Sequence, residues 1–394
     1  MQRLDGRPEV VERILLGPGP SPVSPRVLEA MSRPTIGHLD PAFLNIMSST
    51  MDLIKYVYQT NNAVSIPMSG TGSAGMETVF VNVIEPGDKV IVCENGVFGQ
   101  RMIDVAGRCG AEVIQVNAPW GCPIDPNEVK KAISANKKIK AVAIVHAETS
   151  TGVLQPLDEI ASLAHEAGAL LIVDTVTSLG GVEVPVDKYG LDVVYSGTQK
   201  CLSCPPGLSP VTLSDRAVQC LNQRKNKVQS WYLDLSMIQR YWDAERFYHH
   251  TAPINAIYGL HEALQLIKEE GLENRFKRHQ LNSKALIAGL EAMGMKMLVQ
   301  PEYRLAPLNT VIIPDGIDDL KVRKALLNDY SIEIGGGLGD LKGKIWRIGL
   351  MGYGSTKRNV VLVLTTLANV LADLGYKADI ANALAAVREV YQNN

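Results

Sequence analysis

The chain contains two short apolar runs that each lead into a residue able to carry chemistry, Leu170-Leu-Ile-Val-Asp174 and Val193-Val-Tyr-Ser-Gly-Thr-Gln-Lys200. The apolar part of each run is rich in β-branched residues, which is typical of strands buried on both faces. Outward along the chain, similar runs recur at Val90-Ile-Val-Cys93, Glu112-Val-Ile-Gln-Val116 and Ala141-Val-Ala-Ile-Val145. Helix-like segments lie between the runs, at 100–109, 126–134 and 157–167. This alternation predicts an α/β fold with a parallel sheet covered by helices on both faces.

The composition is that of an ordinary globular protein. Of the 394 residues, 46% are hydrophobic and 20% are charged, which excludes a disordered chain and a disulfide-stapled miniprotein. The formal net charge of −2 provides no basic field for nucleic acid. The apolar runs are too short to span a bilayer, and the N-terminus has no signal-peptide core. The six cysteines are scattered, which suits a reducing compartment. Together these features lead us to expect a cytoplasmic, soluble, multidomain protein that binds neither nucleic acid nor membranes.

The pattern changes after Val211-Thr-Leu213, where an aromatic-rich segment follows the last run. From about residue 271 the chain reads as a second unit, with a long helix, strands at Asn309–Ile313 and Lys344–Ile348, and closing helices. The segment from Met1 to Leu16 contains too few apolar side chains to form a core of its own. We therefore expect it to lie across a partner subunit. We therefore predict an N-terminal arm (1–16), a large domain (17–270) and a small C-terminal α/β domain (271–394).

A glycine-rich segment, Ser69-Gly-Thr-Gly-Ser-Ala-Gly75, follows one candidate strand and opens a helix. Its Gly70-x-Gly72-x-x-Gly75 spacing is that of the dinucleotide fingerprint, with Glu94 at the distance of a ribose-binding acid. A nicotinamide-dependent oxidoreductase is therefore one hypothesis. More generally, small residues at a helix N-terminus expose backbone N–H groups to any phosphate, and the hydroxyls of Thr71 and Ser73 would add donors.

Asp174 and Lys200 favour a different cofactor. Both follow strands of the expected parallel sheet, where ligands bind at the carboxyl ends, so both side chains could reach one crevice. A partly buried lysine loses its proton readily, and a neutral amine can form an imine with an aldehyde. A buried aspartate facing a ring nitrogen would keep that nitrogen protonated. Either residue alone could belong to a structural ion pair, but together with the phosphate-binding loop they predict a pyridoxal 5'-phosphate (PLP) site.

The chain resembles the class V, fold type I, PLP-dependent aminotransferases, and is most similar to the alanine–glyoxylate and serine–pyruvate group. The similar segments run in the family's order from about residue 15 to 355: Leu16-Gly-Pro-Gly-Pro20, Ser69-Gly-Thr-Gly-Ser73, Asn95-Gly-Val-Phe-Gly-Gln-Arg101, His146-Ala-Glu-Thr-Ser-Thr-Gly-Val153, Val173-Asp-Thr-Val-Thr-Ser-Leu-Gly180, Tyr195-Ser-Gly-Thr-Gln-Lys200, Pro205-Pro-Gly207, Tyr248-His-His-Thr251 and Arg347-Ile-Gly-Leu350. The resemblance implies a large domain with a mainly parallel, seven-stranded sheet and a smaller C-terminal α/β domain. It also implies a homodimer with shared active sites that transfers an amino group from alanine or serine to glyoxylate or pyruvate.

The resemblance further implies roles for residues around the cofactor ring. Lys200 would hold PLP covalently and then move a proton, while Asp174 would pair with the pyridine nitrogen. Phe98, where close relatives often have tryptophan, and Val176 would contact the two faces of the ring. Thr149 would contact the ring hydroxyl.

The implied phosphate site consists of Thr71, Gly72, Ser73 and Gln199, completed by Tyr248 and Thr251 from a partner subunit. Ser73 departs from a histidine found in some animal relatives.

The implied substrate site is Arg347, with the backbone of Gly19 nearby. An arginine suits a carboxylate because its planar guanidinium stays charged and donates two parallel hydrogen bonds. Strand periodicity puts Trp346 and Ile348 on the opposite face, where they can pack on a core. Without the cofactor motifs, a surface arginine would be the default interpretation.

Other hypotheses remain open at this point. A 2-aminoethylphosphonate or 3-hydroxykynurenine transaminase would share the cofactor residues, whereas a desulfurase is disfavoured because no cysteine follows Cys220. A catalytically silent PLP-binding module would lack a role for Arg347. Cys201-x-x-Cys204 lacks the further ligands that zinc needs, so we interpret both cysteines as fillers and expect no metal site.

Overall fold

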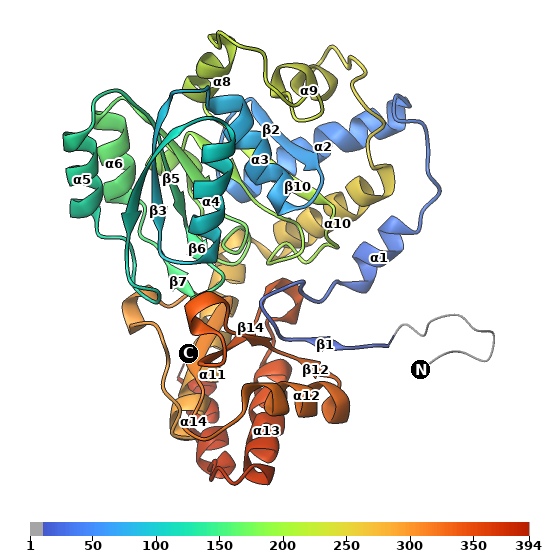
Figure 1. Cartoon of the computed structure of the whole chain (residues 1–394). Helices are drawn as coiled ribbons and strands as arrows, with labels where there is room; N and C mark the ends of the chain where they lie inside the picture. The colour runs from blue at the N-terminus through green and yellow to red at the C-terminus, as the bar shows by residue number, and fades with distance from the viewer. Residues whose placement is uncertain (1–10, 394) are drawn as a thin grey trace.

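The computed structural model describes residues 11–393, and its larger body is built on one seven-stranded sheet (Figure 1). In spatial order the strands are β2 (Val64–Ser69), β10 (Leu208–Leu213), β9 (Val193–Tyr195), β8 (Leu170–Asp174), β5 (Ile139–Val145), β3 (Lys89–Glu94) and β4 (Glu112–Asn117). All neighbouring pairs are parallel except those of β10, which runs antiparallel to both β2 and β9. The prediction of an α/β fold with a mainly parallel sheet is therefore confirmed.

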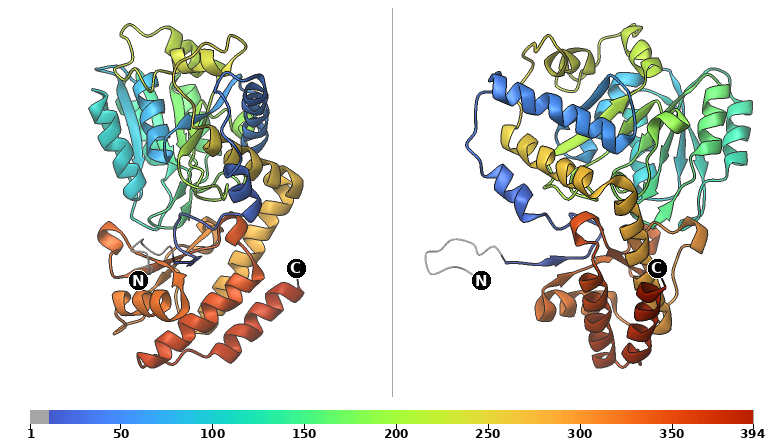
Figure 2. Two further views of the ribbon diagram at one scale, coloured as in Figure 1. Left: turned by 90° about the vertical axis from the view of Figure 1, so that its right-hand side faces the viewer. Right: turned by 180° about the vertical axis from the view of Figure 1, so that it is seen from behind.

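Helices cover both faces of this sheet, which explains why its central strands are apolar throughout. Figure 1 shows α3 (Gly72–Val83) and α4 (Val97–Arg108) in front of the sheet, and Figure 2 shows α2 (Pro41–Tyr58) and α10 (Ile254–Glu270) behind it. The remaining helices of the body are α1 (Pro25–Met31), α5 (Pro126–Ala135), α6 (Asp158–Glu166), α7 (Val186–Tyr189), α8 (Asp215–Asn222) and α9 (Leu235–Trp242). A small hairpin, β6 (Ala147–Glu148) with β7 (Val153–Leu154), follows β5.

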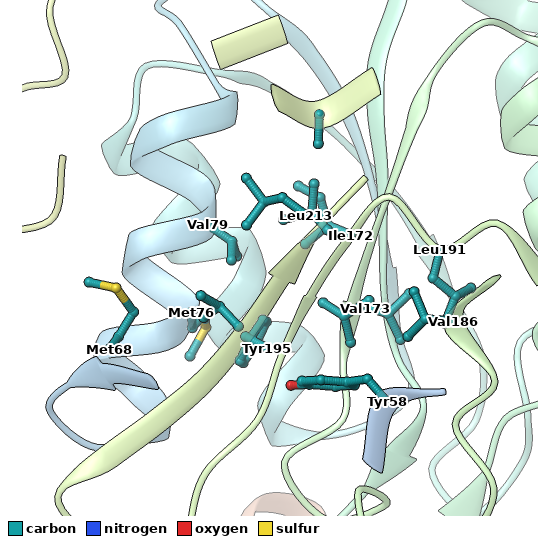
Figure 3. Close-up of a cluster of buried hydrophobic side chains, with 14 of the residues drawn as sticks. Tyr58, Met68, Met76, Val79, Ile172, Val173, Val186, Leu191, Tyr195 and Leu213 are labelled. Atoms are coloured by element: carbon teal, nitrogen blue, oxygen red, sulfur yellow. The ribbon is translucent and has the colours of Figure 1, made fainter. Parts of the chain in front are cut away.

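The core of the larger body lies between the sheet and these helices. Figure 3 shows a part of it, in which Met76 and Val79 of α3 lie beside Tyr195 and Leu213 of the sheet. All four side chains are buried. This packing fixes α3, and therefore its N-terminus, relative to the carboxyl end of β9.

A second body, lower in Figure 1, has its own core. Its sheet consists of β11 (Leu308–Ile312), β14 (Ile345–Gly349) and β13 (Gly335–Gly336), with β14 in the middle and antiparallel to both neighbours. The helices around it are α11 (Leu272–Ala292), α12 (Asp319–Tyr330), α13 (Lys357–Asp373) and α14 (Ile380–Gln392). Three single-turn 3₁₀ helices lie in its loops, at Pro301–Tyr303, Gly339–Leu341 and Gly352–Gly354. The division at residue 271 stays a prediction, but α10 ends and α11 begins on either side of it.

The end of the predicted arm packs on its own chain. Strand β1 (Ile14–Leu15) pairs in parallel with β12 (Ile332–Glu333), and Leu16 is buried in the second core. This differs from the expectation that the arm lies across a partner, because Leu16 finds its apolar environment within the same subunit. The predicted arm over 1–10 lies outside the described residues. Within 11–393, no helix is long and apolar enough to cross a membrane.

Candidate active site

A cavity of about 170 Å³ opens at the carboxyl ends of β8 and β9, beside the first turns of α3 and α4. It brings together most of the residues predicted to hold the cofactor. Its lining consists of Thr71, Gly72, Ser73, Met76, Phe98, Arg101, Asp174, Val176, Tyr195, Gln199 and Lys200.

Asp174 ends β8 and is buried at the base of this cavity. One carboxylate oxygen accepts a hydrogen bond from the backbone N–H of Val176 at 2.8 Å, and the other accepts from the hydroxyl of Tyr195 at 2.7 Å. Burial raises the pKa of Asp174 from 3.8 to about 6, against the lowering effect of the Tyr195 hydrogen bond. The carboxylate is therefore ionised at neutral pH without an ion pair among residues 11–393. A buried anion in this situation is complementary to a cationic ligand group.

Lys200 lies in the turn after β9, and its side chain is almost fully buried. Its ammonium nitrogen donates to the carbonyl of Pro18, and the hydroxyl of Ser21 donates to the carbonyl of Lys200 at 2.6 Å. Burial lowers the pKa of Lys200 to about 8, and the positive charge of Arg347 adds to this effect. The amine therefore has a substantial neutral fraction near physiological pH, which a nucleophilic amine requires.

Gly19 makes the close approach to Lys200 possible. A Cβ atom at this position would lie 2.7 Å from the lysine Nζ, and the backbone φ of +105° favours glycine. The Pro18–Gly19 segment thus closes over the amine.

The start of α3 provides the donors expected of a phosphate site. Thr71 is the N-cap residue, and its side chain makes no capping hydrogen bond, so its hydroxyl is available to a ligand. Thr71 and Ser73 are exposed at the mouth of the cavity, while Gly72 is buried. The unpaired N–H groups of a helix's first turn suit an anion. Together with Gln199, these donors fit the phosphate group of PLP.

Phe98 and Val176 line the cavity from two different elements, the start of α4 and the turn after β8. Both are half-buried. The guanidinium of Arg101 lies 4.8 Å from the centre of the Phe98 ring, on the next turn of α4. A flat ring between Phe98 and Val176 would be in contact with apolar side chains, which fits a pyridine ring.

Arg347 reaches the site from β14 of the second body. Its Nε donates to the carbonyl of Gly336 at 2.8 Å and its Nη1 to the carbonyl of Thr149 at 3.0 Å, which fixes the guanidinium. Burial lowers the pKa of Arg347 to about 10, so it remains charged at neutral pH. Trp346 and Ile348 are buried in the second core, as predicted from strand periodicity. The hydroxyl of Thr149 bonds that of Thr177 at 2.5 Å.

Comparisons with known proteins agree with this geometry. A family model described as "Aminotransferase class-V" matches residues 14–340. The chain belongs to the class V aminotransferases. Members of this family are generally PLP-dependent, and the membership decides against a nicotinamide-dependent oxidoreductase.

Three relatives illustrate the similarity of this aminotransferase to known ones. A (S)-ureidoglycine–glyoxylate transaminase of Bacillus subtilis is 40% identical over 99% of this chain and 98% of its own. An alanine–glyoxylate aminotransferase of Mus musculus is 41% identical over 92% of this chain and 88% of its own. The crystal structure of an alanine–glyoxylate aminotransferase from Nostoc has a TM-score of 0.91 and 50% identity, over 92% of this chain and 96% of that one.

Three predicted cofactor residues of the aminotransferase do not line this cavity: Thr149, Tyr248 and Thr251. Tyr248 and Thr251 are exposed, with their hydroxyl oxygens 3.5 Å apart. Neither lines the cavity of its own chain. Their assignment to a partner's site stays a prediction.

Sequence reasoning missed Tyr195, Arg101 and Met76 as lining residues. For Tyr195 a signal existed: it ends β9 as Asp174 ends β8, and the two are direct partners in the strand register. Residues at neighbouring strand ends of a parallel sheet reach the same crevice.

Two other candidate sites from the sequence, Glu94 and the pair Cys201 and Cys204, do not offer free ligand-binding groups. The carboxylate of Glu94, the candidate ribose acid, accepts from the indole of Trp120 at 2.9 Å. Cys201 and Cys204 are buried, which raises the pKa of each thiol to about 12. Between residues 11 and 393 there is no cluster of histidine, cysteine and acidic side chains that could hold a metal ion.

Proposed function

We propose that this aminotransferase uses PLP to transfer the amino group of a small amino acid, alanine or serine, to glyoxylate or pyruvate. The observation that carries the proposal is the meeting of Lys200 and Asp174 at one cavity, with Arg347 close enough to lower the pKa of the lysine. The names of relatives, alanine–glyoxylate and ureidoglycine–glyoxylate aminotransferases, support glyoxylate as the acceptor.

Each residue then has one physical task. When bound, PLP supplies an electron-withdrawing ring that acidifies the amino acid's Cα–H bond. The carboxylate of Asp174, ionised at neutral pH, stabilises positive charge on the ring nitrogen. The Nζ of Lys200 holds and releases a proton readily because its pKa is about 8. Arg347 binds the substrate carboxylate and thereby fixes the orientation of the reacting bond.

The closed surroundings of Lys200 support a short substrate side chain. Pro18 and Gly19 lie against the amine of Lys200, and the backbone carbonyl of Thr149 holds Arg347 in place. Among the related hypotheses, a 2-aminoethylphosphonate donor carries no α-carboxylate, so Arg347 would have to bind a phosphonate instead. A 3-hydroxykynurenine donor would have to fit an aromatic side chain beside Gly19.

A matrix of donors and acceptors tests this proposal. The purified enzyme, supplied with PLP, would be assayed with alanine, serine, ureidoglycine, 2-aminoethylphosphonate and 3-hydroxykynurenine against glyoxylate and pyruvate. We expect the highest kcat/KM for alanine or serine with glyoxylate. A kcat/KM that is highest for any of the other three donors would contradict the choice of donor and leave transamination intact.

We also propose a homodimer in which the partner subunit contributes Tyr248 and Thr251 to the phosphate site. The support is an exposed aromatic patch around these residues, which includes Trp231, Tyr232 and Phe247. Exposed aromatic side chains in a group are typical of protein–protein interfaces. All six cysteines are unpaired, which supports our further proposal of a reducing compartment such as the cytoplasm.

A further inference from the structure

Helix α4, which carries Phe98, begins without a capping side chain of its own. Its N-cap residue is Gly96, and no side chain caps the helix locally. The N–H groups of the first turn are instead bound by side chains of the hairpin segment after β5. The hydroxyl of Ser150 accepts from the N–H of Val97 at 3.0 Å, and Glu148 accepts from those of Phe98 and Gly99 at 3.2 and 3.4 Å.

Glu148 is a buried carboxylate with four donors. Besides the two N–H groups of α4, its other oxygen accepts from the backbone N–H of Ser150 at 3.0 Å and from the Ser150 hydroxyl at 2.5 Å. Only 1% of Glu148 is exposed. Gly96 leaves the room for this arrangement, because a Cβ there would lie 2.4 Å from the carboxyl carbon of Glu148.

The same segment holds Arg347. The residue next to Glu148 is Thr149, whose carbonyl accepts from the Arg347 guanidinium at 3.0 Å. The negative charge of Glu148 also raises the pKa of Arg347, against the larger lowering effect of burial. One short segment therefore joins the helix that carries Phe98 to the arginine proposed to bind the substrate carboxylate.

We propose that Glu148 is a positioning residue of the active site, whose carboxylate holds Phe98 against the cofactor ring and keeps Arg347 aligned through Thr149. The inference rests on the proposed function, which assigns the ring and the substrate carboxylate to those two residues. The charge matters as well as the shape, because hydrogen bonds to an ionised acceptor are about twice as strong as those to a neutral one.

The test compares Glu148→Gln with a matched control, Asp192→Asn. Asp192 is equally buried, and it also accepts a hydrogen bond from a backbone N–H, that of Leu171 at 3.0 Å. Leu171 lies near the start of β8, however, whereas the cavity lies at the end of β8 that carries Asp174. Both variants would be purified with PLP and studied at about pH 8, because burial raises the pKa of Glu148 to about 7. Three quantities would be measured: amide hydrogen exchange in α4, the Kd for PLP, and kcat and KM for alanine.

In Glu148→Gln we expect the N–H groups of Phe98 and Gly99 to exchange about tenfold faster, as a charged acceptor becomes a neutral one. The Kd for PLP and the KM for alanine should each rise several-fold, while kcat changes less. In Asp192→Asn the exchange of α4 and the Kd for PLP should equal those of the unmodified enzyme.

Two results would overturn the proposal. The first is unchanged amide exchange in α4 together with an unchanged Kd for PLP in Glu148→Gln. The second is an equal loss of PLP affinity in Glu148→Gln and Asp192→Asn. If Glu148→Gln does not fold, Ser150→Ala decides instead, because it removes the hydroxyl between Val97 and Glu148 and should loosen the same turn. A different outcome separates the two proposals. If α4 exchanges faster in Glu148→Gln but the unmodified enzyme has no transaminase activity, the capping role stands and the proposed function is refuted.

Discussion

Asp174 is predicted to destabilise the cofactor-free protein, so that Asp174→Asn should make this form more stable. Burial raises the pKa of Asp174 in the folded state from 3.8 to about 6. A carboxyl with a raised pKa contributes stability that is present below the unfolded pKa and is lost as the pH rises through the folded pKa. The difference between 3.8 and about 6 corresponds to about 3 kcal/mol, at 1.36 kcal/mol per pKa unit.

The asparagine side chain removes the charge and can keep both hydrogen bonds. Its oxygen can accept from the N–H of Val176, and its NH₂ group can donate to the hydroxyl oxygen of Tyr195. The stability advantage of the variant should therefore grow by about 2 kcal/mol between pH 4.5 and pH 8. Below about pH 3 the two proteins should be equally stable, because the carboxyl of Asp174 is then neutral in both the folded and the unfolded state.

Urea unfolding of the cofactor-free proteins, followed by far-UV circular dichroism at several pH values, measures this difference. With saturating PLP the unmodified protein should be the more stable of the two. PLP binds the folded state and not the unfolded state, so the protein that holds PLP more tightly gains more stability. The reasoning would be refuted if Asp174→Asn were no more stable than the unmodified protein at pH 8, or if the difference did not depend on pH.

The remaining predictions concern the other proposed site residues. Lys200→Ala should fold, lose turnover and lose the visible absorbance of lysine-bound PLP; normal turnover with that absorbance retained would remove Lys200 from its role. Arg347→Lys should raise the KM for alanine about tenfold or more while leaving PLP absorbance unchanged, since an ammonium cannot make the paired hydrogen bonds of a guanidinium; an unchanged KM in steady-state assays would contradict this. Mixing Lys200→Ala subunits with Tyr248→Phe/Thr251→Ala subunits should restore part of the activity, because a heterodimer has one intact shared site; no recovery after verified subunit exchange would argue against sharing.

The sequence by itself was sufficient for the central part of the fold. The apolar runs that became β3, β5, β8 and β9 are buried on both faces, and burial on both faces is what removes polar residues from such strands. Because parallel strands end at one edge, the sequence alone assigns Asp174 and Lys200 to a common crevice. The role of Arg347 was implied by the family resemblance, and the alternation of side chains along β14 predicted only that Trp346 and Ile348 lie on the face opposite to it.

Only the tertiary structure decided which distant segments complete the site. Glu148 caps a helix 50 residues earlier in the chain, and the Pro18 carbonyl meets a lysine 182 residues later. Leu16, expected in an arm across a partner, is buried instead in the second core of its own chain. Local periodicity reports which face of an element is buried, whereas these contacts depend on how separate elements pack and on the register of their pairing. That is why the strands and the residues at their ends could be predicted from the sequence, and the hydrogen bonds that hold those residues in position could not.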